Sequence, residues 1–268
     1  MADQISKDFE TDIERVRAAY TWIAYHVQYD IQEGNFPSYS YVSEEDRIVK
    51  EQKYAAKLSK RVITKKKAVC EGYSYLFKTV CESLQIKTTV VTGASKTLSR
   101  DIGRRYNSDH AWNIVTIDNQ KYFIDVTWAS TLNMSKADIN YYYFMTSPEL
   151  FILDHYPDIY SNSLLDTKIS KKEFLENPLL YDYTPTKVKL IYPFEGVLIK
   201  NKKHAFKFDV TEPVTWIQAK MGKESINIKT YTHQNSALEF DLGIPGYSKA
   251  RDVIIFINGI PIVTYAIK

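Results

Sequence analysis

Three side chains in this sequence have the types and spacing that suit nucleophilic catalysis. Cys70 opens a predicted helix in the stretch KKKAVCEGYSYLF, residues 65–77. A thiol at a helix N-terminus beside an imidazole is favoured as the thiolate, which is the form that attacks. His110 and Asp125 are the candidates for the general base and for the acid that orients it. The pattern predicts a cysteine nucleophile with a His–Asp pair, recognised by role rather than by position in the chain.

A predicted hairpin links His110 to Asp125. His110 begins one apolar strand, Asp125 lies near the end of the next, and Asp118-Asn119 between them suits a two-residue turn. That turn pairs residues whose numbers sum to 237, so the two side chains are diagonal neighbours on one face of the sheet. A carboxylate in an otherwise apolar run is costly to bury without a partner, and His110 is the natural one.

Other side chains near these positions have a structural interpretation beside a functional one. By strand alternation Trp112 shares the face of His110, and we expect it to line a substrate cleft, although aromatic core packing is equally open. The same alternation places Trp128 on the opposite face. His155 in the stretch DHYPDI is expected to be a structural histidine in a loop.

The elements that must position these residues can be read from periodicity. Apolar residues at helical spacing predict helices over 8–27, 43–60 and 70–84, with loops at 35–41 and 97–107. Strands are predicted over 87–93, 110–116 and 121–127, and a short helix is expected near Ser147-Pro148.

After about residue 184 the pattern changes to alternation, with turn signals every 8–12 residues. This predicts an all-β sandwich of about seven strands, Ig-like in size. The predicted domains are therefore a core over 1–184 and a sandwich over 185–268, with the boundary at Tyr183-Thr184-Pro185.

Composition bounds the function classes. The chain has 268 residues, 44% of them apolar and 25% charged, and its net charge of +3 is too small to argue for nucleic acid. No stretch approaches the roughly 18 uninterrupted apolar residues of a membrane span. The two cysteines, Cys70 and Cys81, are too far apart along one helix to pair. Cys81 lies in the middle of the apolar stripe of that helix, and we expect it to be a core residue.

Three blocks of this sequence resemble the transglutaminase-like superfamily, cysteine enzymes with a papain-like core. The blocks are VRAAYTWIAYHVQYD, VCEGYSYLF and DHAWNIVTIDNQKYFIDVTW. The resemblance extends over roughly residues 10–183 and is closest to the kyphoscoliosis-peptidase-like branch. It implies an α+β core, with helices packed on an antiparallel sheet, followed here by the Ig-like sandwich.

The resemblance also implies a chemistry and carries the triad onto Cys70, His110 and Asp125. The implied reaction is acyl transfer from a glutamine side chain or a peptide bond through a thioester, to water or to an amine. For the oxyanion, the backbone N–H of Cys70 is one candidate donor, and Gln28 and Tyr29 are both open as the second. The calcium-binding loops of animal transglutaminases have no counterpart in this sequence, so we expect no metal and no cofactor.

Three functions remain open on the sequence alone. A peptidase or amidohydrolase acting on a protein or peptide substrate comes first, and a cross-linking or amine-transferring enzyme with the same triad comes second. The third is a catalytically silent scaffold that binds a partner through its sandwich. Oligomeric state is open, and so is the compartment: a reactive thiol without disulfides fits the cytoplasm, while this domain layout fits periplasmic or extracellular export if Met1 is not the native start.

Overall fold

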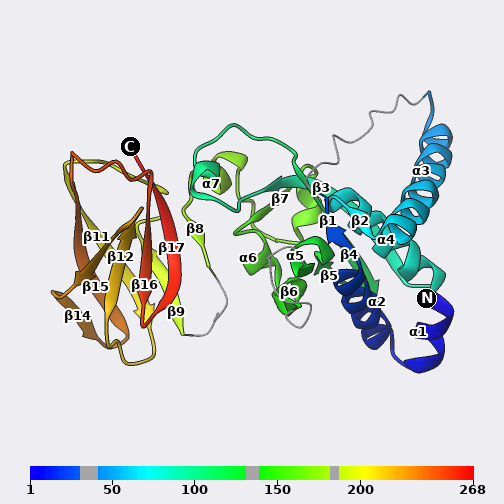
Figure 1. Ribbon diagram of the computed structural model, residues 1–268, viewed down its shortest axis with the longest axis horizontal. Helices are drawn as coiled ribbons and strands as arrows, with labels where there is room; N and C mark the ends of the chain where they lie inside the picture. Colours follow the sequence, from blue (N-terminus) through cyan, green and yellow to red (C-terminus); the bar gives the residue numbers. More distant parts are fainter. Residues whose placement is uncertain (31–41, 131–138, 182–186) are drawn as a thin grey trace. The chain divides into compact units, whose positions relative to one another are not determined.

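The computed structural model describes residues 1–30, 42–130, 139–181 and 187–268, which fold into two compact units (Figure 1). The first unit is built from 1–94, 108–151 and 157–165, and the second from 95–107, 152–156 and 166–268. The predicted loop at 35–41 and the predicted boundary at 183–185 lie outside the described residues.

The first unit is a mixture of helices and short strands. Its helices are α1 (Ala2–Asp8), α2 (Asp12–His26), α3 (Glu44–Lys65), α4 (Cys70–Ser83), α5 (Val126–Ser130) and α6 (Pro148–Phe151), with 3-10 turns η2 (Tyr141–Tyr143) and η3 (Tyr160–Ser163). Its strands are β1 (Gln28–Tyr29), β2 (Lys67–Ala68), β3 (Lys87–Ser95, of which Ser95 belongs to the second unit), β4 (His110–Ile117), β5 (Gln120–Ile124) and β6 (Phe144–Thr146).

The helix predicted over 8–27 is α2, which begins at Asp12 rather than at residue 8, and a separate helix, α1, precedes it. Phe9 is extended and ends α1. Thr11 then starts α2 with a capping box: its hydroxyl accepts from the Glu14 N–H at 3.3 Å, and the Glu14 carboxylate accepts from the Thr11 N–H at 3.0 Å. The two bonds give partners to two backbone N–H groups at the start of α2. This favours a new helix start at Thr11 over a helix that continues from α1. The predicted starts of the next two helices, at Ser43 and Cys70, are confirmed.

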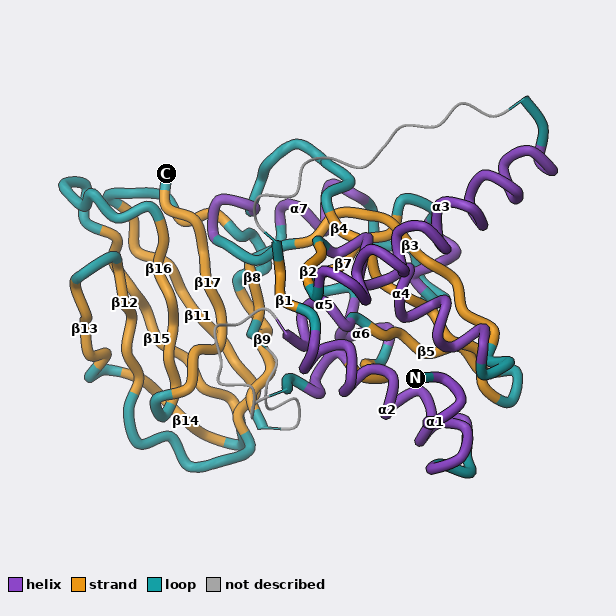
Figure 2. The backbone as a smooth tube through the Cα atoms, turned by 45° about the vertical axis from the view of Figure 1, so that its right-hand side comes forward, coloured by secondary structure: helices purple, strands orange, loops and turns teal. Residues whose placement is uncertain are grey.

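Strands β3 to β6 form an antiparallel sheet in the order β6-β5-β4-β3, and helices cover one of its faces (Figure 2). The apolar layer between helices and sheet includes Tyr20, Val62 and Phe77 from the helices and Val115 from β4. The opposite face carries a smaller, mostly aromatic cluster. An α+β unit with helices packed on an antiparallel sheet is therefore confirmed.

The hairpin of β4 and β5 has the predicted register. Asn113 pairs with Ile124 and Ile117 pairs with Gln120. Asp118 and Asn119 form the turn with φ of 51° and 62°, the left-handed conformation that a two-residue turn of this type requires.

The second unit contains the sandwich. Its elements are η1 (Ser99–Asp101), β7 (His155–Pro157, of which Pro157 belongs to the first unit), α7 (Lys171–Glu176), β8 (Leu179–Leu180), β9 (Val188–Tyr192), β10 (Val197–Leu198), β11 (Lys202–Val210), β12 (Ile217–Met221), β13 (Glu224–Ile228), β14 (Tyr231–Gln234), β15 (Ala237–Ile244), β16 (Asp252–Ile257) and β17 (Ile260–Ile267).

Two sheets enclose the core of this unit. One has the order β10-β17-β16-β12-β13, with β8 also pairing with β17, and the other has the order β14-β15-β11-β9. Phe206 from one sheet meets Tyr265 from the other edge to face, with ring centroids 5.5 Å apart. The all-β character predicted for this region is confirmed, with nine strands rather than about seven in the described residues 187–268. An Ig-like topology stays a prediction.

Candidate active site

Cys70 is the first residue of α4 and is 3% exposed. The chain enters this helix from β2, and close packing at Gly72 fixes the approach. A Cβ at Gly72 would lie 2.6 Å from the Cβ of Ala68, so only glycine fits there without a shift. The first-turn N–H groups of a helix have no partner within the helix and form the positive end of its dipole. Cys70 therefore sits where a developing anion is favoured.

The residue after Cys70 ties the start of α4 to α3. The Tyr54 hydroxyl donates to a carboxylate oxygen of Glu71 at 2.6 Å. Burial raises the pKa of Glu71, which the hydrogen bond from Tyr54 and the charge of Arg61 only partly oppose. The sequence does not predict this contact, because no periodicity relates a tyrosine on one helix to an acid on another.

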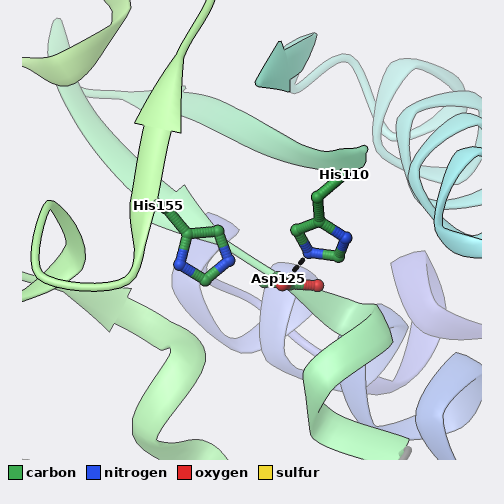
Figure 3. Close-up of side chains that lie close together, drawn as sticks. All are labelled: His110, Asp125 and His155. Atoms are coloured by element: carbon green, nitrogen blue, oxygen red, sulfur yellow. Dashed lines mark hydrogen bonds and ion pairs between the residues drawn. The ribbon is translucent and has the colours of Figure 1, made fainter. Parts of the chain in front are cut away.

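His110 and Asp125 form the predicted pair. The distance from His110 Nε2 to Asp125 Oδ2 is 2.7 Å, and both side chains are almost fully buried (Figure 3). The other carboxylate oxygen, Oδ1, accepts from the N–H groups of Thr127 and Trp128 at 2.8 and 3.2 Å. Asp125 thus caps the short helix α5 with one oxygen and holds the imidazole with the other.

This capping role corrects one prediction. The strand expected over 121–127 ends at Ile124, and Val126–Ser130 form α5 instead. The physical reason is that Asp125 offers its carboxylate to the N–H groups that follow it, which is what an N-cap aspartate does. The sequence signal for this cap is the aspartate itself, but the apolar run before it favours a strand.

The charge state of His110 follows from its neighbours. Burial alone lowers its pKa, but the charge of Asp125, the hydrogen bond to Asp125 and the hydrogen bond and charge of Cys70 together raise that pKa to about 10. Because Nε2 faces Asp125, Nδ1 is the ring nitrogen left for the Cys70 side chain. The structure therefore brings all three predicted residues together in the order Cys70, His110, Asp125.

Two tryptophans flank the imidazole of His110. The ring centroids of Trp112 and Trp128 lie 6.0 and 5.2 Å from that of the imidazole. Placing Trp128 on the opposite face was wrong, because it belongs to α5 and not to a strand. Trp112 is 1% exposed and packs edge-on against Phe151, so it supports the imidazole, and its contact with substrate stays a prediction.

Gln28 and Tyr29, the two candidates for a second oxyanion donor, form β1 beside the strand that leads into α4. Burial raises the pKa of the Tyr29 hydroxyl, and the charges of Cys70, Asp125 and Asp109 raise it further. Tyr29 is thus within electrostatic reach of Cys70, and it is the stronger candidate of the two.

The other candidate groups lie in structural settings. Cys81 is fully buried, and burial raises its pKa to about 12 although a hydrogen bond with Thr88 opposes this. His155, expected in a loop, begins β7, is fully buried and bonds through Nδ1 to Asp154 at 2.5 Å. Among the described residues, no three His, Cys, Asp or Glu side chains of the same unit gather at metal-binding distance. No described helix is both long and apolar enough to cross a bilayer.

Comparison with protein families assigns part of this chain to a superfamily. Residues 1–126 match the model of the transglutaminase-like superfamily, and this part of the chain belongs to that superfamily. The chain is similar to kyphoscoliosis peptidase of Homo sapiens, with 32% identity over 184 residues that cover 66% of this chain and 26% of that protein. The Mus musculus protein of the same name is 31% identical over 188 residues, covering 68% and 26%. The aligned region spans about a quarter of the length of these relatives.

Among solved structures, the chain is similar to a putative cysteine protease from Cytophaga hutchinsonii. The identity is 20% and the TM-score 0.34, over 47% of this chain and 35% of that one. A likeness of this size adds nothing to the fold described above.

Proposed function

We propose that the protein is a cysteine-dependent acyl-transfer enzyme that hydrolyses amide or peptide bonds in protein or peptide substrates. The observation that carries this proposal is the buried 2.7 Å bond between His110 and Asp125, with the Cys70 side chain hydrogen-bonded to the same imidazole at the start of α4. These contacts support the roles of nucleophile, base and orienting acid for Cys70, His110 and Asp125, the combination that nucleophilic catalysis requires.

In the proposed mechanism the resting site is a thiolate of Cys70 paired with the imidazolium of His110. The sulfur attacks the substrate carbonyl carbon, and the oxyanion is held by the backbone N–H of Cys70 and the hydroxyl of Tyr29. The tetrahedral adduct collapses to a thioester as His110 gives its proton to the leaving amine. Neutral His110 then takes a proton from water, which attacks the thioester and releases the acid and the sulfur.

The choice of water over an amine as acceptor has indirect support. Two relatives are named as peptidases, although the alignment covers only a quarter of their length. Transfer to an amine uses the same residues and differs in how well the cleft excludes water. We therefore place cross-linking second.

The pH dependence of alkylation tests the site. Iodoacetamide labelling of Cys70, followed by intact mass, is compared in the wild type and in His110→Ala. We expect labelling that stays fast well below the ordinary thiol pKa of about 8.5 in the wild type and slows sharply in the variant. Slow labelling that rises only near pH 9, unchanged by the substitution, would refute the enzyme and favour a binding role for the sandwich.

Product analysis separates the two acceptors. A glutamine-bearing peptide is incubated with and without a primary amine, and its mass is followed. Cleavage or deamidation supports hydrolysis, and an amine adduct supports cross-linking.

A further inference from the structure

Asn113 is a fully buried polar side chain in the layer between helix α4 and the sheet. It lies on β4 three residues after His110 and is 0% exposed. The neighbouring positions on its face of the strand, Ala111 and Val115, are apolar and equally buried. Elements α4 and β4 pack against each other and lie side by side in both backbone views (Figures 1 and 2).

Only one of the two polar atoms of the Asn113 side chain, Nδ2, makes a hydrogen bond to the described residues. Its Nδ2 donates to the carbonyl of Ser74 on α4 at 3.1 Å and makes a longer contact of 3.5 Å with the carbonyl of Thr89 on β3. Both neighbours are acceptors, so the nitrogen must face them. Among the described residues, Oδ1 is buried without a hydrogen-bond partner. A half-satisfied buried amide lowers stability relative to an apolar residue of the same shape, so stability does not explain it.

We propose that Asn113 is a positioning residue that fixes α4 against β4 and thereby sets Cys70 against His110. Ser74 is one helical turn after Cys70, and Asn113 is three residues after His110. One directional bond therefore joins the helix that carries the nucleophile to the strand that carries the base, close to both. The inference rests on the proposed function, because it concerns how that site is assembled.

The physical argument is that apolar packing does not set position finely. Burial of apolar surface is non-directional, so a helix held by it alone tolerates small slides along the sheet. A buried polar contact gives one register a preference over its neighbours, as a single buried asparagine does in coiled coils. Proton transfer between Cys70 and His110 depends on distances that a shift of about 1 Å destroys.

Two substitutions of Asn113 test the proposal, one that should preserve the Tm and one that should lower it. Asn113→Leu keeps the shape and removes the polar atoms, so we expect a Tm no lower than that of the wild type. The rate of Cys70 alkylation at pH 7 should nevertheless fall by about tenfold to a hundredfold, and the midpoint of its pH profile should move towards that of a free thiol. Asn113→Asp places a carboxylate against two carbonyl oxygens, so it should lower both the Tm and the rate.

Val115→Ala is the matched control. It removes buried volume from the same face of the same strand, and we expect a lower Tm with an unchanged pH profile. An Asn113→Leu protein that keeps the wild-type profile within about twofold would overturn the proposal, since its predicted loss is at least tenfold.

Hydrogen exchange keeps this test separate from the proposed function. In Asn113→Leu, peptides covering the first turns of α4 should exchange faster while those from the sandwich do not change. If His110→Ala leaves Cys70 alkylation unaltered, the proposed function fails. The positioning role of Asn113 is then tested by hydrogen exchange alone. Unchanged exchange in those peptides overturns the positioning role.

Discussion

Helix α4 carries a cysteine near each end, and the two ends differ in their partners rather than in burial. Cys70 is 3% exposed and Cys81 is 0% exposed. At the first turn, the side chain meets His110, which Asp125 holds in place. Eleven residues later, the thiol is packed in the apolar core, and burial raises its pKa to about 12. The comparison teaches that a buried thiol becomes a candidate nucleophile through the polar groups around it.

The largest expected effect is a contrast between the two cysteines: substitution of Cys70 should remove activity, and substitution of Cys81 should lower stability. Cys70→Ala should abolish rapid alkylation and lower kcat by about 10⁴-fold or more, with little change in Tm. Cys81→Ala should leave alkylation and kcat near wild type but cost about 1 kcal/mol of stability, because a packed group is lost from the core. Intact mass after labelling and thermal unfolding measure both. Rapid labelling that persists in Cys70→Ala would break the comparison.

Next in size is the loss of the carboxylate that holds His110. Asp125→Asn keeps an oxygen that can cap α5 but removes the negative charge, so the pKa of His110 should fall. We expect kcat to drop by about 10² to 10⁴-fold, as when an orienting acid is neutralised in other triads. The pH profile of Cys70 alkylation, measured in this variant beside Cys81→Ala, checks it. A profile identical to that of the wild type would mean that Asp125 serves only as a helix cap.

Much of this site could be predicted from the sequence, because the determinants are local. The turn residues Asp118 and Asn119 set the register of the hairpin, and the register places His110 near Asp125. The start of α4 at Cys70 follows from the apolar stripe that it begins. In each case the relevant spacing lies within one element or one hairpin.

The rest depended on contacts between elements that no local pattern relates. The bond of Tyr54 to Glu71 joins two helices, and the bond of Asn113 joins a strand to a helix. The start of α5 is a third case, because Val126 and Thr127 are β-branched and favour a strand, whereas the Asp125 cap favours a helix. The first two cases depend on tertiary hydrogen bonds, and in the third a local cap overrides strand propensity.

A smaller effect is expected from the second oxyanion donor. Tyr29→Phe should lower kcat by about 10² and change KM little, because the hydroxyl would act only on the charge that develops in the transition state. The control is Gln28→Ala on the same short strand, which should lower kcat by no more than about threefold if Gln28 is not a donor. Equal losses in both variants would point to a general disturbance of β1 rather than to an oxyanion contact.

The last prediction compares the two ends of α4 through the pH dependence of stability. Folded His110 keeps its proton to about pH 10, whereas unfolded histidine loses it near 6.5, so stability should fall with rising pH between these values. Cys81 stays protonated to about pH 12 in the fold, whereas an unfolded thiol ionises near pH 8.5. The stability that protonated Cys81 contributes is therefore lost only as the pH rises above about 8.5. Because the Cys70 side chain is hydrogen-bonded to the same imidazole, the comparison uses a Cys70→Ser background. Between pH 7 and 8.5, denaturant unfolding should show a slope of up to about 1.4 kcal/mol per pH unit that His110→Gln removes and Cys81→Ala retains. A slope that persists in His110→Gln would mean that a group other than His110 binds the proton. The two ends of α4 would then not differ in this electrostatic respect.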